Sequence, residues 1–206
     1  MLADTDVSVN LNTPRFWNIE ASLQDTSSTV LLDTETGGRV AHWAELDYAF
    51  GGRDSVQPDR QALLIWPAAR LKSSTRYIVG VRNLHNATGA LVSSSRAFAE
   101  LREGRATGWR VAAFKDIFSR LGSIGVPRDS SLQLAFDFTT ASDATVIGPM
   151  VSARDDALRR YPDGAEVVIT KVTDHVHENV ARIVEGVMRT PLYLNQITPG
   201  LSARLA

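Results

Sequence analysis

Residues 61–90 read QALLIWPAARLKSSTRYIVGVRNLHNATGA, and this stretch decides the expected fold. Residues 62–66 form an apolar run that Pro67 ends, and residues 76–82 alternate between apolar and other side chains. Period-two alternation is typical of a strand with one buried face, and here that face carries Tyr77, Val79 and Val81. We therefore expect two antiparallel strands joined as a hairpin, a building unit of an all-β sandwich.

The stretch upstream predicts a second hairpin. Residues 29–33 and 40–46 are short β-type runs on either side of a Gly-Gly turn. Residues 1–28 are mostly polar, and we interpret them as an irregular lead-in. Together with the first hairpin, these runs predict a β-sandwich over residues 29–100.

Residues 101–162 predict a helical insert. Apolar side chains recur there at helical spacing and form one stripe: Val111, Phe114, Ile117, Phe118 and Leu121. Residues 132–138 alternate again and predict a strand, and the hydroxyl side chains of residues 139–142 are candidate caps for a helix over residues 144–160. The insert is therefore expected to be an αβα segment.

Residues 163–206 predict the strands of a second β region. Residues 166–172 and 180–188 are the expected strands, and residues 173–179 are an expected loop between them. Two or three strands do not make a stable sheet alone, so either they join the first sandwich or the natural protein continues beyond Ala206. The expected fold class is mainly β with a helical insert (α+β), ending in an incomplete second β region.

Composition and charge narrow the classes of partner. Hydrophobic residues make up 44% and charged residues 22%, which is ordinary for a packed domain. The net charge of −1 gives no electrostatic footprint for nucleic acid or an anionic membrane. The chain has no cysteine, which removes disulfides, thiol catalysis and cysteine-based zinc sites.

Targeting signals are not predicted either. The longest apolar runs fall far short of the roughly 20 residues that a membrane span needs. The N-terminal sequence MLADTDVSVNLNTPRFW lacks a basic segment followed by an apolar one, so it is not a signal peptide. If the chain is exported, its signal has been removed or lies upstream.

The sequence DHVHE over residues 174–178 is the strongest candidate for a metal site. His175 and His177 would point the same way on an extended segment, and His-x-His is a real metal-ligand spacing. Zinc needs a third or fourth ligand, and His42 and His85 are the other histidines. A solvated loop between two strands explains the same residues without any metal.

Motifs for catalysis or cofactor binding are missing. The sequence contains no G-x-S-x-G, no P-loop and no G-x-G-x-x-G, so we assign no catalytic residue, no cofactor-binding residue and no cofactor. The aromatic residues Trp43, Trp66, Trp109 and Tyr77 could form a sugar-binding platform, but core packing is the simpler interpretation.

An ordered set of strings resembles one known family. These strings resemble the N-terminal Ig-like region of large exported bacterial α/β-hydrolase-like proteins. The set covers residues 28–194 and reads STVLLD (28–33), GRV (38–40), HWAELD (42–47), QALLI (61–65), PA (67–68) with Leu71, TRYIV (75–79), RNL (82–84), LAFDFT (134–139), AS (141–142), RDDA (154–157), RIVEG (182–186) and TPLYL (190–194).

The resemblance implies a non-catalytic accessory or interaction region. In such proteins the hydrolase-like segment with its nucleophile follows the region seen here, so no catalytic residue carries over. The implied location is exported or cell-surface, and the implied partner is a downstream hydrolase-like domain or another subunit. Two alternatives stay open: a stand-alone hydrolase or metal-dependent enzyme using residues 174–178 with His42, and a structural subunit of a larger assembly that exposes apolar helix faces.

Overall fold

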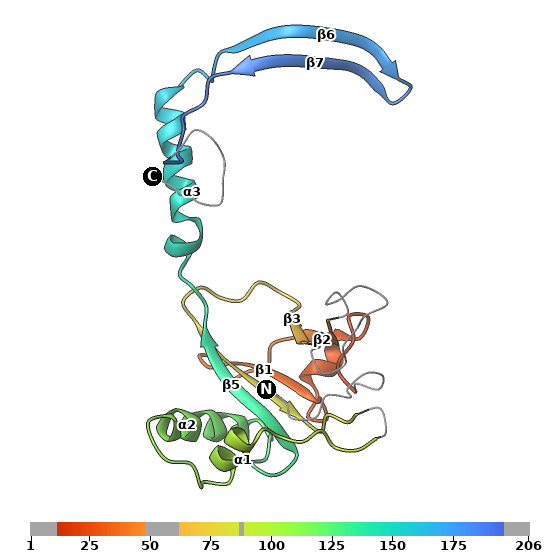
Figure 1. Ribbon diagram of the computed structural model, residues 1–206, viewed down its shortest axis with the longest axis vertical. Helices are drawn as coiled ribbons and strands as arrows, with labels where there is room; N and C mark the ends of the chain where they lie inside the picture. Colours follow the sequence, from red (N-terminus) through yellow and green to blue (C-terminus); the bar gives the residue numbers. More distant parts are fainter. Residues whose placement is uncertain (1–11, 48–61, 87–88, 196–206) are drawn as a thin grey trace. The chain divides into compact units, whose positions relative to one another are not determined.

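The computed structural model describes residues 12–47, 62–86 and 89–195 (Figure 1). The chain divides into two compact units, Met1–Ala141 and Ser142–Ala206, which are taken separately below. In the described residues the elements are strands in small antiparallel sheets, α-helices and one short 3₁₀ helix, η1 (Ile19–Leu23). No helix among these residues combines the length and the apolar character that crossing a membrane requires.

The first unit is built on a three-stranded antiparallel sheet. Its strands are β1 (Thr29–Asp33), β4 (Arg76–Arg82) and β5 (Leu132–Thr139), in the order β1-β4-β5. A separate antiparallel pair is made by β2 (His42–Leu46) and β3 (Leu63–Pro67). The strands therefore lie where the alternation of the sequence predicts them.

The predicted pairing of these strands is correct only at the Gly-Gly turn, where the Asp33 amide donates to the Gly38 carbonyl and the Val40 amide to the Leu31 carbonyl. We expected β3 to form a hairpin with β4 and β1 to form one with β2, whereas β4 pairs with β1 and β5, and β3 pairs with β2. Between β1 and β2 the ladder is reduced to one isolated bridge, Leu32 to Arg39. Strand β4 pairs with strands distant in the sequence, and not with its neighbour β3, because these pairings allow both faces of β4 to be buried.

Strand β4 is buried on both faces, which corrects the expectation of a half-buried strand. Every β4 residue from Tyr77 to Arg82 is buried. On the face predicted to be exposed, Ile78 is fully covered, and a Cβ added at Gly80 would meet Leu121 Cδ2 at 3.4 Å. Glycine thus allows a helix to approach the middle of the sheet closely.

Two helices cover that face of the sheet. They are α1 (Arg96–Arg102), which the sequence pattern did not indicate, and α2 (Arg110–Ser123). The stripe predicted for α2 is largely confirmed: Ile117, Phe118 and Leu121 are buried, Phe114 is partly buried, and Val111 is exposed. The resulting core joins strand and helix residues, namely Val30, Leu32, Ile78, Phe98, Ile117, Phe118, Leu121, Val126, Leu132 and Ala135.

The opposite face of the sheet has its own apolar cluster. Leu31 of β1 and Tyr77 and Val79 of β4 are buried there. Val40, Ile65 of β3 and Leu71 pack against them. A neighbouring cluster adds Leu46 of β2 and Leu63 of β3, which pack with Val81 of β4. The β2–β3 pair therefore contacts the three-stranded sheet through residues of both its strands.

In its described residues, 142–195, the second unit consists of one helix and one long β-ribbon. Helix α3 (Asp143–Arg160) begins at the predicted hydroxyl cap, where Ser142 Oγ accepts a hydrogen bond from the Thr145 amide at 3.1 Å. Strands β6 (Val167–His177) and β7 (Val180–Met188) pair with each other. The expected loop over residues 173–179 is wrong, because β6 continues through His177 and leaves only a short turn.

Replacement of Leu121 by alanine tests the helix-covered core. Leu121 is 0% exposed, so Leu121→Ala is expected to lower the free energy of unfolding by about 2–5 kcal/mol through lost burial and a residual cavity. The matched control is Leu23→Ala, at a leucine 42% exposed, which should cost far less. Urea unfolding followed by tryptophan fluorescence gives both values, and equal losses would contradict this core.

Candidate interaction site

His42, a residue of the enzyme alternative, is fully occupied by structural hydrogen bonds. Its ring is buried, and Nδ1 donates to the Val40 carbonyl at 2.8 Å. With the proton on Nδ1, Nε2 accepts from the Thr29 hydroxyl at 2.8 Å. The His42 amide donates to Ser22 Oγ at 3.0 Å, so this residue links β2 to β1 and η1. Both ring nitrogens are therefore committed to the fold.

Burial also decides the charge of His42. Loss of hydration lowers the pKa of the imidazole, and the charge of Arg39 lowers it further. The hydrogen bond to the Val40 carbonyl acts in the opposite direction but is the smaller influence. His42 is consequently a neutral structural histidine.

The predicted metal ligands His175 and His177 lie at the end of the β-ribbon. Both are exposed, and His175 has a positive φ of 52° within a bulge between Asp174 and His177. This bulge interrupts the alternation that would align the two imidazoles. No group of three or more histidine, aspartate or glutamate side chains suited to a metal occurs in the described part of the chain. A metal site at these histidines stays a prediction.

Two of the four aromatic residues considered for a sugar platform lie together. Trp43 and Trp66 face each other across β2 and β3, with ring centroids 6.1 Å apart and planes 14° from parallel. Tyr77 instead belongs to a buried cluster, and Trp109 precedes α2. The tryptophan pair is a cross-strand contact of the kind that stabilises a two-stranded sheet.

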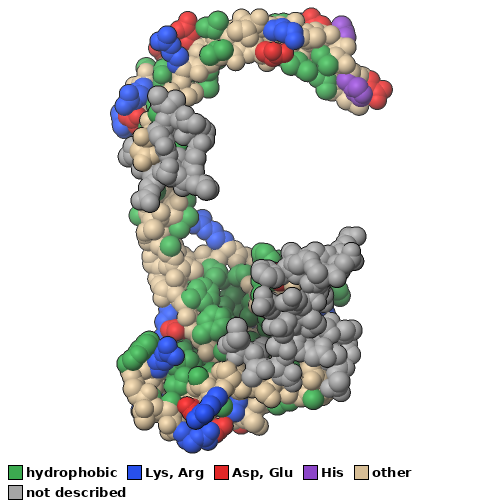
Figure 2. Space-filling view, viewed as in Figure 1, with side chains coloured by type: hydrophobic (Ala, Val, Ile, Leu, Met, Phe, Trp, Pro, Cys, Tyr) green, Lys and Arg blue, Asp and Glu red, His purple; other side chains and the backbone are tan. Residues whose placement is uncertain are grey.

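The β-ribbon of β6 and β7 exposes apolar side chains along its length (Figure 2). Every residue of both strands is exposed except the half-buried Thr173. Among the described residues, no further strand pairs with either edge of the ribbon. An isolated two-stranded ribbon is at best marginally stable in water. The surface of the ribbon is therefore a candidate interaction surface.

The strand register separates the two faces of the ribbon. Paired residues share a face, and along β7 alternate residues share a face. The face here called the apolar face carries six large apolar side chains, 39% to 59% exposed: Val167, Ile169, Val172, Val180, Val184 and Met188. Near the turn it also carries His177 and the Asp174–Arg182 ion pair. The opposite face, here called the mixed face, carries Val168, Ile183 and Val187 together with Thr173 and the Lys171–Glu185 ion pair.

A β-bulge creates this segregation. Ile169 pairs with Gly186, Lys171 pairs with Glu185, and Thr170 is the extra residue between them. Without the extra residue, plain alternation would place Ile169 on the same face as Lys171. The bulge instead keeps Ile169 with Val172, so the charged side chain moves to the mixed face.

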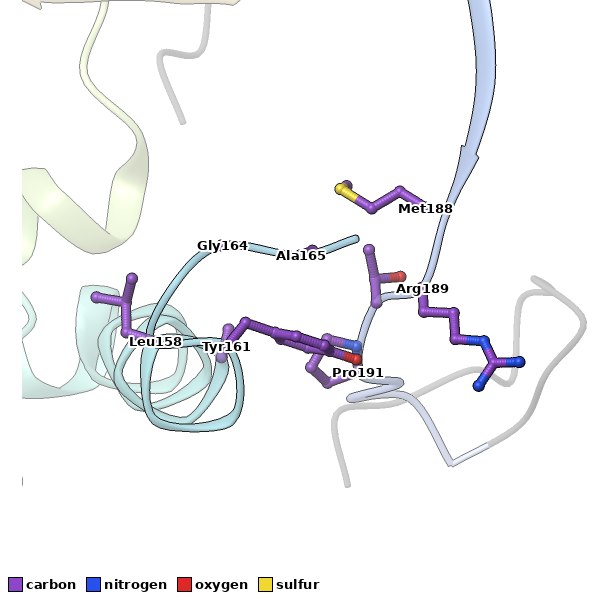
Figure 3. Close-up of a pocket in the computed structure, with 9 residues that line it drawn as sticks. Leu158, Tyr161, Gly164, Ala165, Met188, Arg189 and Pro191 are labelled. Carbon is purple, nitrogen blue, oxygen red and sulfur yellow. The ribbon is translucent and has the colours of Figure 1, made fainter. Parts of the chain in front are cut away.

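A small apolar pocket adjoins the end of the ribbon (Figure 3). Leu158 and Tyr161, at the end of α3, lie on one side of it, and Met188 and Pro191 lie on the other. Its volume of about 240 Å³ is below the roughly 300 Å³ at which ligand sites begin, and no nucleophile–base pair lines it. Its size suits one apolar side chain of a partner. Through Met188, the pocket continues the apolar face.

Helix α3 has an exposed apolar stripe of its own. Every residue of α3 is described, and none is buried. Four large apolar side chains, 46% to 69% exposed, lie on the helix: Val146, Ile147, Met150 and Leu158. Ile147, Met150 and Leu158 recur at roughly helical spacing in the sequence, and the structure leaves all three exposed.

The bulge at Thr170 lies beside Gly186, the partner of Ile169, where an added Cβ would lie 2.9 Å from the Val168 carbonyl oxygen. A glycine inside a strand often marks a bulge or a close backbone approach, so Gly186 was the signal that could have located it.

Comparison of the chain with protein-family models, curated proteins and solved structures gave no match. The functional argument consequently depends on the residues and on their geometry.

The neutral His42 predicts a pH dependence of stability. In the unfolded chain its pKa returns to about 6.5, so below that pH the unfolded state binds a proton that the folded state does not. The free energy of unfolding should therefore fall between about pH 7 and about pH 5, by at most about 1.4 kcal/mol per pH unit from this residue. Urea unfolding at several pH values measures the slope. His42→Gln should be less stable but flatter across this range, and an unchanged slope would contradict the assignment.

Proposed function

We propose that this chain is a non-catalytic interaction region, accessory to a hydrolase-like domain of a larger exported or cell-surface protein. The apolar face of the β-ribbon is the observation that carries the proposal. Six large apolar side chains are presented there on strands whose edges no other described strand covers. Contiguous exposed apolar surface is typical of sites that bind other proteins.

The remaining features of the described residues support binding better than turnover. His42 is committed to structural hydrogen bonds through both ring nitrogens. The pocket beside Met188 offers an apolar anchor point but no pair of groups for acid–base work. A surface of this kind holds another protein surface in place.

The hydrolase-like neighbour and the exported location are carried by the family resemblance of residues 28–194. The same resemblance makes the first unit an Ig-like β-sandwich. The packing of Ile65 against the three-stranded sheet is compatible with two facing sheets. The accessory role then places the chemistry of the parent protein in a separate domain.

A second candidate function, a structural subunit of a larger assembly, is favoured by α3. Of the two long helices, α2 buries its apolar stripe and α3 does not. A helix with an uncovered stripe generally packs against another element. Interaction and assembly use the same second unit, so these two functions are compatible.

Ester hydrolysis with metal analysis distinguishes the proposal from the enzyme alternative. The purified chain is expected to hydrolyse p-nitrophenyl esters no faster than buffer, with or without added zinc, and to retain no stoichiometric metal after dialysis. His175→Ala and His177→Ala should change nothing. Zinc-dependent turnover that either substitution abolishes would overturn the proposal.

The coding sequence tests the hydrolase-like neighbour. If the chain is an accessory region of such a protein, the reading frame is expected to continue beyond the codon for Ala206 into a segment with G-x-S-x-G at a strand-to-helix turn. Sequencing of the gene gives the answer. A stop codon directly after Ala206 would remove the support for a covalently joined hydrolase-like domain and leave the assembly subunit as the better function.

A further inference from the structure

We propose that the apolar face of the ribbon binds α3 of a second copy of this chain, in a two-fold dimer in which each helix covers the other chain's ribbon. The inference rests on the proposed function in one respect, that the second unit binds protein. It goes further by naming the partner as an identical chain and the contact as helix on ribbon.

The second unit carries both halves of a helix-on-sheet layer, and neither half is covered. One half is the apolar face, and the other is the stripe of α3. A sheet face and a helix stripe that lack cover are the two surfaces that join when a layered domain forms. Each copy therefore has what the other copy lacks.

The two surfaces match in length. Helix α3 has 18 residues, which at ~1.5 Å per residue makes it ~27 Å long. Strand β7 has 9 residues, which at ~3.4 Å per residue makes it ~30 Å long. One helix can thus cover the apolar face from end to end.

The chain's own helix does not make this contact. The residues of β6 and β7 are exposed, so α3 of the same chain leaves the ribbon uncovered. The Tyr193 hydroxyl donates to Asp156 Oδ2 at 3.0 Å and ties the segment after β7 to the C-terminal half of α3. The C-terminal end of α3 is thus close to the ribbon at the pocket near Met188, which is at one end of the apolar face. The rest of the apolar face remains exposed.

The charges on the two surfaces are complementary. Arg154 lies between Met150 and Leu158 at four-residue spacing, so it belongs to the stripe of α3. It forms an ion pair with the adjacent Asp155, at 2.6 Å. The apolar face contains one carboxylate, Asp174, which pairs with Arg182 at 2.5 Å. With α3 on the apolar face, Arg154 can meet Asp174 and Asp155 can meet Arg182, which leaves no net charge in the interface.

Two-fold symmetry closes the assembly. Each chain contributes one helix and one ribbon, so the same contact forms twice and no surface is left to bind a third chain. A head-to-tail arrangement of the same surfaces would instead form a larger ring or an open filament. The pair therefore has a defined stoichiometry that an experiment can measure.

Sedimentation velocity of the full chain at micromolar concentration tests the proposal with a matched pair of substitutions. Val184 and Val187 lie on the same strand and are both exposed, but Val184 is on the apolar face and Val187 on the mixed face. The wild-type chain should be a dimer. Val184→Asp should weaken it by ~100-fold, because the contact buries a charge twice, and Val187→Asp should leave it intact. On the helix, Met150→Asp should dissociate the dimer, whereas Ser152→Asp should not.

A charge exchange tests the specific contact and guards against misfolded variants. Arg154→Asp and Asp174→Arg should each weaken the homodimer, because each places like charges opposite each other in both contacts. Mixing these two variants should restore a dimer, since in the mixed pair the exchanged charges attract in one contact and the native charges meet in the other. Contacts within one chain cannot be restored by mixing.

Three results would overturn the inference: a monomeric wild-type chain, equal effects of the two valine substitutions, or failure of the mixture to restore the dimer. A monomer whose binding to another protein is abolished by Val184→Asp would overturn the second copy and leave the proposed function standing. Histidine-dependent ester hydrolysis would overturn the proposed function whatever the state of association.

Discussion

The first unit depends on one constraint, which is that β4 is buried on both faces. A strand in that position needs a hydrogen-bonded neighbour on each edge and an apolar layer on each side. The chain meets these needs with β1 and β5 at the edges, α1 and α2 on one side, and residues around Ile65 on the other. Gly80 allows Leu121 to reach the sheet, so the closest helix contact falls at the middle of this strand.

The second unit differs from the first because its strands and its helix lack a buried core. Its ribbon and its helix have regular backbone hydrogen bonds, yet none of its strand or helix residues in the described part of the chain is buried. Backbone order without apolar burial leaves the entropic cost of folding uncompensated. The apolar face, the pocket beside Met188 and the stripe of α3 are the exposed apolar surfaces on which the proposed interaction depends.

The sequence predicts much of the fold but only part of the candidate site. Alternation located β4 and β5, and the spacing of Phe114, Ile117 and Leu121 located α2. The sequence also located both strands of the ribbon. It could not assign the ribbon's faces, because plain alternation groups Ile169 with Lys171, and only the register shift at Thr170 separates them. The His-x-His spacing near the turn predicts a metal site, whereas the larger exposed feature lies on the strands beside it.

What the sequence determined by itself is local: where strands and helices lie, and which hydroxyl begins α3. These features follow from interactions between residues a few positions apart, and the residues concerned carry that information directly. What only the tertiary structure decided is which strand pairs with which, and which side chains remain exposed. The pairing of β4 with β1 and β5 joins residues far apart in the chain. Their association is decided by the apolar area that the whole unit buries, which no short stretch of sequence contains.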